Sequence, residues 1–122
     1  MVQHLQQLPS PGTHLIFREG DFLHVKLSVP EGLEGKAYVR TNLYDPHLKR
    51  KELIAKNEHG ISRRFQEWGD FPMFQKKENG FYIELPLVTI GFFEAKAFFI
   101  PEGQAEPLWP EGDNIYIKVE PA

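Results

Sequence analysis

The stretch GFFEAKAFFI, residues 91–100, sets two charged side chains of opposite sign among aromatic and aliphatic ones. In a β-strand, successive side chains point to opposite faces of the sheet. Glu94 and Lys96 therefore share one face with two of the phenylalanines. The other face is apolar and predicts a core layer made of Phe93, Ala95, Ala97 and Phe99. A mixed face of this kind is either half-solvated or prepared for binding, and periodicity does not choose between the two.

Residue types that carry out catalysis or bind metals show no recognisable pattern elsewhere in the chain. The five histidines include no pair at the i, i+4 spacing of a helical metal site, and the chain has no cysteine. None of the three serines lies in a G-x-S-x-G motif, and no glycine-rich phosphate loop is present. We therefore expect no catalysis by this chain alone, and neither a cofactor nor a metal.

Composition and charge argue against several further classes of protein. A chain of 122 residues with a net charge of −3 and scattered basic residues lacks the clustered positive footprint of a nucleic-acid-binding protein. The N-terminal residues lack the basic and apolar regions of a signal peptide, and no apolar stretch is long enough to span a membrane. We therefore expect a cytoplasmic protein with neither nucleic acid nor membrane as partner.

The fold prediction rests on short stretches of alternating polarity separated by turn residues. Strong helix signals are absent. This pattern predicts an all-β fold, an immunoglobulin-like antiparallel β-sandwich of early-set type with about seven strands. The candidate strands are 14–17, 22–29, 36–43, 52–55, 71–75, 81–87, 91–100 and 114–120.

One domain accounts for the whole chain, residues 1–122. Within it, residues 1–13 are predicted to be an N-terminal extension, and 43–67 a long inserted connection with weak periodicity. The sequence ends two residues after its last candidate strand. A domain excised from a larger enzyme is expected to end in this way.

Four stretches in the second half of the chain resemble carbohydrate-binding module family 48 and its relatives: WGDFPM, NGFYIELPL, GFFEAKAFF and DNIYIKVEP. The family includes the glycogen-binding domain of the AMP-activated protein kinase β subunit and early-set domains N-terminal to glycogen-debranching, isoamylase-like and branching enzymes. Two features depart from the family pattern, namely the insertion 43–67 and the segment around Trp109. The positions that match the pattern are Trp68, Pro72-Met73, Leu85-Pro86, Gly91, Lys96 and Asn114.

The resemblance implies that Trp68, Lys96 and Asn114 bind α-glucan, with Trp109 as a second stacking ring. Such residues suit a sugar, because an indole packs on the apolar face of the ring while Lys and Asn bond the hydroxyls. The chain would then be a non-catalytic domain that binds or orients glycogen or starch, N-terminal to a glycogen-debranching or amylase-like catalytic domain. Its partners would be an α-glucan polysaccharide or maltooligosaccharide and the catalytic domain of the same chain, a glycoside hydrolase such as amylo-α-1,6-glucosidase.

Each of these four residues also has a structural interpretation. Trp68 closes an edge of the sandwich, Lys96 pairs with a carboxylate, and Asn114 follows a turn. Trp109 packs against the core or against another domain. The alternative function is therefore a structural or protein-interaction β-sandwich that packs on a catalytic domain without sugar affinity.

Overall fold

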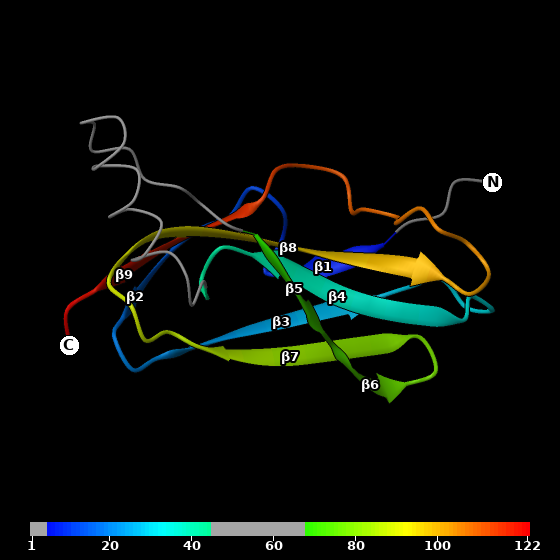
Figure 1. The fold of residues 1–122 in the computed structure, drawn as a ribbon, viewed down its shortest axis with the longest axis horizontal. Helices are drawn as coiled ribbons and strands as arrows, with labels where there is room; N and C mark the ends of the chain where they lie inside the picture. Colours follow the sequence, from blue (N-terminus) through cyan, green and yellow to red (C-terminus); the bar gives the residue numbers. More distant parts are fainter. Residues whose placement is uncertain (1–4, 45–67) are drawn as a thin grey trace, which may run out of the picture.

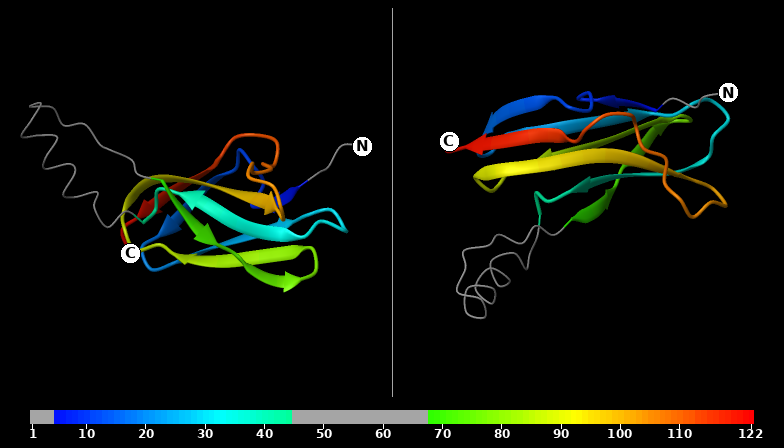
Figure 2. Two further views of the ribbon diagram at one scale, coloured as in Figure 1. Left: turned by 45° about the vertical axis from the view of Figure 1, so that its right-hand side comes forward. Right: turned by 90° about the horizontal axis from the view of Figure 1, so that it is seen from above.

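The computed structural model describes residues 5–44 and 68–122, and all regular structure in these two ranges is β-strand (Figure 1). Nine strands form two sheets that face each other as two layers (Figure 2). The predicted all-β sandwich is therefore confirmed. In the described part of the chain, no helix of membrane-spanning length and apolarity is found.

The first sheet has four strands in the order β1-β3-β7-β6, and all of its neighbours pair antiparallel. Its central strands, β3 and β7, pair over their full length, from Phe22 opposite Pro86 to Ser28 opposite Gly80. The strand bounds are β1 Gln6–Leu8, β3 Phe22–Ser28, β7 Gly80–Pro86 and β6 Phe74–Lys77.

The second sheet has five strands in the order β2-β9-β8-β4-β5. The edge strand β2 runs parallel to β9, whereas the other neighbours pair antiparallel. The longest strand, β8, therefore lies at the centre of this sheet, between β9 and β4. The strand bounds are β2 His14–Arg18, β9 Ile115–Glu120, β8 Gly91–Pro101, β4 Gly35–Thr41 and β5 Gly69–Pro72.

Alternating side chains from both sheets fill the space between the two layers. In β8 the predicted core set is buried, and β3 contributes Leu23, Val25 and Leu27 from the other layer. Burial of this apolar surface is the main stabilising contribution to a fold of this kind. The prediction that Phe93, Ala95, Ala97 and Phe99 form a core layer is confirmed.

Two segments pass from one sheet to the other at the edges of the sandwich. The stretch predicted as one strand, 71–75, is divided at Met73, so that β5 belongs to the five-stranded sheet and β6 to the four-stranded one (Figure 1). Likewise, β1 and β2 belong to different sheets, and β1 lies inside the segment predicted as an N-terminal extension. The candidate strand 52–55 and most of the insertion 43–67 lie outside the described residues.

Candidate binding surface

The outer face of β8 explains why a strand this apolar carries two opposite charges. Lys96 Nζ donates a hydrogen bond to the Gly112 carbonyl, and Asn114 Nδ2 donates to the Glu94 carboxylate over 3.0 Å. Gly112 and Asn114 both belong to the connection between β8 and β9. The two charged side chains therefore hold that connection against the sheet from which it departs.

The same connection places Trp109 over the sheet. Its neighbour Leu108 exchanges two backbone hydrogen bonds with Phe99, of 3.0 and 2.7 Å. The indole then stacks on Phe98, with ring centres 4.6 Å apart and planes tilted by 35°. Lys96 Nζ lies 5.9 Å from the indole centre, within the range of a cation–π contact.

Phe98 is an exception to the expected pattern, because it belongs to the outer face and yet is only 2% exposed. Tyr38 on β4 stacks against it with ring centres 5.4 Å apart, and Trp109 lies 4.6 Å from it. Three aromatic rings thus form a continuous row across the outer face, Tyr38–Phe98–Trp109. In contrast, Phe92, on the same face of β8, is 67% exposed.

Arg40 on β4 lies beside this aromatic row and is held by Asp70 on β5. Its Nε and Nη2 donate to the two Asp70 carboxylate oxygens over 2.7 and 3.0 Å, a bidentate pair. The hydrogen bonds from Arg40 to Asp70 raise the pKa of Arg40 above its ordinary value, with a smaller opposing effect of burial. The guanidinium carbon lies 5.2 Å from the Phe98 ring centre and 5.3 Å from that of Trp109.

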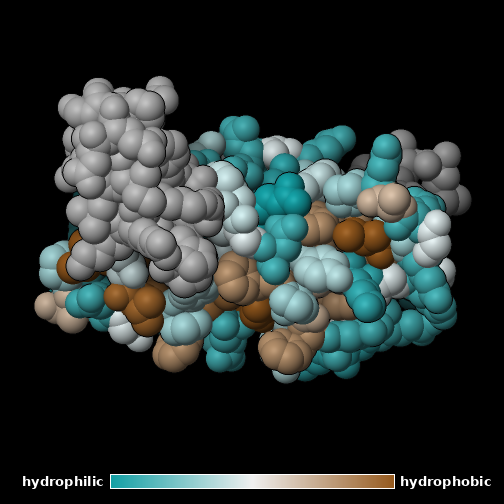
Figure 3. All heavy atoms as spheres, viewed as in Figure 1, coloured by the Kyte–Doolittle hydropathy of each residue, from teal (hydrophilic) through white to brown (hydrophobic). Residues whose placement is uncertain are grey.

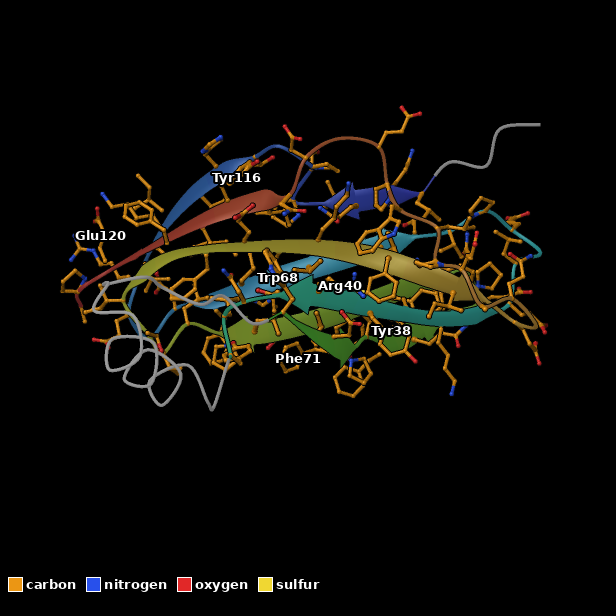
Figure 4. The ribbon with its side chains drawn as sticks, turned by 45° about the horizontal axis from the view of Figure 1, so that its top comes forward. Tyr38, Arg40, Trp68, Phe71, Tyr116 and Glu120 are labelled. Carbon is orange, nitrogen blue, oxygen red and sulfur yellow. The ribbon has the colours of Figure 1, made fainter. Side chains whose placement is uncertain are left out.

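These side chains surround one hollow of about 390 Å³ on the outer face of the five-stranded sheet. Trp68, 42% exposed, precedes β5 and lies beside Arg40 where β4 meets β5 (Figure 4). On the face of the molecule seen in Figure 3, apolar groups alternate with polar ones in small patches. The residues that line the hollow are Arg40, Trp68, Asp70, Lys96, Trp109 and Asn114.

The hollow brings together all four residues singled out in the sequence, Trp68, Lys96, Trp109 and Asn114. Arg40 and Asp70 were not predicted. Alternation in β4 places Arg40 on the same face as Tyr38, but only the register of β4 against β5 sets Arg40 opposite Asp70. That register depends on tertiary pairing, for which the sequence carries no local signal.

The structural interpretations of the four residues can also be compared with their contacts. Among the residues that the structure describes, no carboxylate lies within ion-pair distance of Lys96, whose bond goes to a backbone carbonyl. Asn114 follows a turn in which Gly112 has a φ of +110°. Trp109 packs on Phe98 and keeps 37% of its surface exposed.

Comparison with known proteins identifies the fold but no family. No protein-family model matches the sequence, and no curated protein matches it. Among solved structures, the chain is similar to CopC from Methylosinus trichosporium OB3b, with a TM-score of 0.51 and 13% identity. The similarity covers 98% of this chain and 95% of that chain, and at this identity it shows the shared fold alone.

These comparisons correct the predicted membership of carbohydrate-binding module family 48 and the glycogen- or starch-binding function drawn from it. CopC is not a carbohydrate-binding module, and no finding supports α-glucan binding. Two of the residues that carried the resemblance, Lys96 and Asn114, anchor the β8–β9 connection. The proposed link to a glycogen-debranching or other glycoside hydrolase rested on the same resemblance and loses that support.

Within residues 5–44 and 68–122, no group of three or more His, Cys, Asp and Glu side chains is close enough to hold a metal ion.

Proposed function

We propose that this β-sandwich is a non-catalytic protein-docking domain, and that the hollow between Trp68 and Trp109 binds a segment of a partner protein. The observation that carries the proposal is the row of aromatic rings with two cations beside it. Two of the rings lie on inner strands of the sheet, and the third, Trp109, is held on them by the β8–β9 connection. Trp, Tyr and Arg are the residue types that contribute most of the binding energy in protein interfaces. A site built on strands also loses little conformational entropy when it binds.

Charge indicates the chemistry of the partner segment. The Arg40 guanidinium is already engaged by both oxygens of Asp70, so its charge is locally balanced. Lys96 has three N–H donors, and its one hydrogen bond in the described part of the chain goes to the Gly112 carbonyl. A partner carboxylate can therefore bond Lys96 in the hollow without displacing an ion pair between described residues.

The two indoles at the rim indicate what lies beside that carboxylate. Trp68 and Trp109 each expose part of a flat apolar surface around the hollow. Aromatic and proline side chains pack well on such surfaces, as in the aromatic-lined grooves that bind extended peptides. We therefore propose an extended segment with Asp or Glu next to an aromatic residue or a proline.

A random peptide library displayed on phage tests this proposal, because such a library samples many sequences and no single partner has to be chosen. Wild-type protein and Trp109→Ala are used as parallel baits, and Phe74→Ala is the control. Phe74 is an exposed aromatic residue on β6 of the other sheet and is not among the residues that line the hollow. Peptides with an acidic residue beside an aromatic residue or proline should be enriched on wild type and Phe74→Ala but not on Trp109→Ala.

Two outcomes would contradict the proposal. One is a peptide set that is equally enriched on Trp109→Ala, which would place peptide binding outside the hollow. The other is a saturable change of Trp fluorescence on addition of maltoheptaose that is lost in Trp68→Ala, because the hollow would then be a sugar site.

A further inference from the structure

The edge strand β2 offers unused backbone groups on its open side. The backbone hydrogen bonds that join this segment to β9 are made by its odd-numbered residues. Tyr116 N donates to the Thr13 carbonyl, and Glu19 N donates to the Glu120 carbonyl, both over 2.8 Å. Backbone groups of successive strand residues point to opposite sides of the strand. The groups that point away from β9 therefore belong to His14, Ile16 and Arg18.

One end of this open edge is already closed. Arg18 N donates to Asp21 Oδ2 over 2.8 Å, and Asp21 N donates to the Arg18 carbonyl over 2.9 Å. His14 and Ile16 keep their two N–H donors and two carbonyl acceptors, and nothing in residues 5–44 or 68–122 bonds them. The open edge thus comprises two residues with four hydrogen-bonding groups.

The other three edges of the sandwich carry features that discourage strand addition. β1 has only three residues and is followed by Pro9, β5 ends at Pro72, and β6 carries Lys76 and Lys77. Proline, charge and short length are the usual means of blocking an edge. By contrast, β2 reads HLIFR and has neither proline nor lysine, and Ile16 at its centre is 69% exposed.

We propose that β2 pairs antiparallel with β2 of a second copy of this chain, about a two-fold axis at Leu15. In this register, His14 of each copy lies opposite Ile16 of the other. Each such pair exchanges two hydrogen bonds, as hydrogen-bonded pairs in antiparallel sheets do. All the open donors and acceptors of both copies are then satisfied, and the two five-stranded sheets become one continuous sheet of ten strands.

The apolar surface beside the edge is compatible with this pairing. A second hollow of about 410 Å³ lies on the outer face next to β2, and most of its lining is apolar or aromatic, including Ile16, Phe92 and Tyr116. Pairing at β2 places Ile16 of each copy beside His14 of the other, so that both copies contribute the same residues, as an isologous interface requires. The order of strands places this edge at the opposite margin of the sheet from β5, beside which Trp68 lies (Figure 2). The dimer is thus independent of the proposed docking hollow, and the two proposals can fail separately.

Sedimentation equilibrium of the purified chain tests the dimer directly. Wild type should form a reversible dimer over roughly 10 µM to 1 mM, as expected for a small interface. Ile16→Lys should weaken self-association by about tenfold or more, because it places a charge at the centre of the pairing edge. Phe74→Lys is the control, because Phe74 is nearly as exposed as Ile16 but lies on β6 of the other sheet. A monomeric wild type at about 1 mM would overturn the proposal, as would equal weakening by the two variants.

A single introduced cysteine tests the register. The chain has no cysteine, so Leu15→Cys can form a disulfide only with a second copy. At the two-fold axis the two Cα atoms would be about 4.5 Å apart, within the range that a disulfide spans. Under mild oxidation Leu15→Cys should therefore cross-link much faster than the exposed control Val88→Cys. Cross-linking of both variants at the same rate would rule out this register.

Discussion

At the scale of single residues, several polar side chains complete the backbone hydrogen bonding of the sandwich. Gln7 on β1 is only 4% exposed, and its Oε1 accepts a hydrogen bond of 2.7 Å from the Ala97 N–H on β8 of the other sheet. Its Nε2 donates to the Pro9 carbonyl over 2.9 Å. One buried amide thus connects the two sheets where β9 no longer pairs with β8.

Gln7→Ala should lower the free energy of unfolding by about 1–3 kcal/mol, since it leaves the buried Ala97 N–H without a partner. Urea denaturation measures the loss, with Gln6→Ala as the control, because Gln6 is the exposed neighbour on the same strand. If both variants lose the same small amount of unfolding free energy, the hydrogen bond from Ala97 to Gln7 contributes nothing to stability.

Tyr44 gives the protein a pH dependence in the alkaline range. Burial raises the pKa of Tyr44 to about 12 from its ordinary value of 10.0, and its hydroxyl donates to the Pro86 carbonyl. A raised pKa in the folded state means that stability is complete below pH 10.0 and is lost as the pH rises toward about 12. Between these two pH values, Tyr44 is ionised in the unfolded chain but still protonated in the folded protein.

The free energy of unfolding should therefore decrease less steeply between pH 10 and pH 12 in Tyr44→Phe than in wild type. Urea denaturation at a series of alkaline pH values measures the slope. The control is Tyr82→Phe, which removes an exposed tyrosine from the other sheet. Identical slopes for wild type and Tyr44→Phe would show that the hydroxyl stays exposed to water in the folded protein.

At the scale of strands, β4 and β8 approach each other too closely at one end to admit a side chain. A Cβ added at Gly35 would lie 2.8 Å from Phe99 Cζ and 2.9 Å from Pro101 Cα. Both neighbours are parts of the central strand β8, which cannot move without disturbing the core. Glycine is therefore required at this position by close packing, not by an unusual φ.

Gly35→Ala should cost about 1–3 kcal/mol in unfolding free energy, the usual cost of overpacking. Gly80→Ala is the matched control in another strand, because a Cβ there meets the Lys77 side chain at an ordinary 3.6 Å. Thermal denaturation compares the stability of the two variants. A Gly35→Ala protein as stable as Gly80→Ala would mean that β4 shifts freely against β8.

Alternation of apolar and polar residues predicted the strands correctly where one face is buried and the other is exposed to water. β3 and β9 alternate cleanly, β8 alternates except at Phe98, and all three lie where the periodicity placed them. β1 was missed because three residues with a buried glutamine show no apolar period. The division of 71–75 into β5 and β6 was missed too, since a change of sheet at Met73 leaves no mark on the local pattern.

The candidate site was predictable only in part, for a similar reason. Alternation correctly placed Lys96 on the face opposite the core set of β8. The neighbours of Lys96 in the hollow depend on how the strands are aligned in the sheet. Arg40 lies opposite both Asp70 and Lys96 because β4 pairs with β5 and β8 in one particular register. The function was mispredicted because side chains that carried the resemblance, such as Lys96 and Asn114, also serve to anchor a connection.

At the scale of the whole molecule, the two sheets support surfaces with different tasks. The four-stranded sheet closes the core from one side, while the five-stranded sheet presents the aromatic hollow and the open edge of β2. The two surfaces lie at different places on this sheet, since residues of β4, β5, β8 and the β8–β9 connection line the hollow, whereas the open edge belongs to β2. Trp109→Ala should therefore abolish peptide binding and leave dimer formation unchanged, and sedimentation equilibrium of this variant checks the second half of that statement.

The most direct test of the docking hollow is a double-mutant cycle between Lys96 and the carboxylate of a peptide selected on the wild-type protein. Affinities are measured by Trp fluorescence for wild type and Lys96→Met, each with the acidic peptide and with its Glu→Gln or Asp→Asn form. We expect a coupling energy of about 1 kcal/mol between the two changes, as is usual for a charged hydrogen bond at a half-exposed site. Strictly additive losses would show that the amine and the carboxylate do not meet, and would contradict the proposed mode of docking.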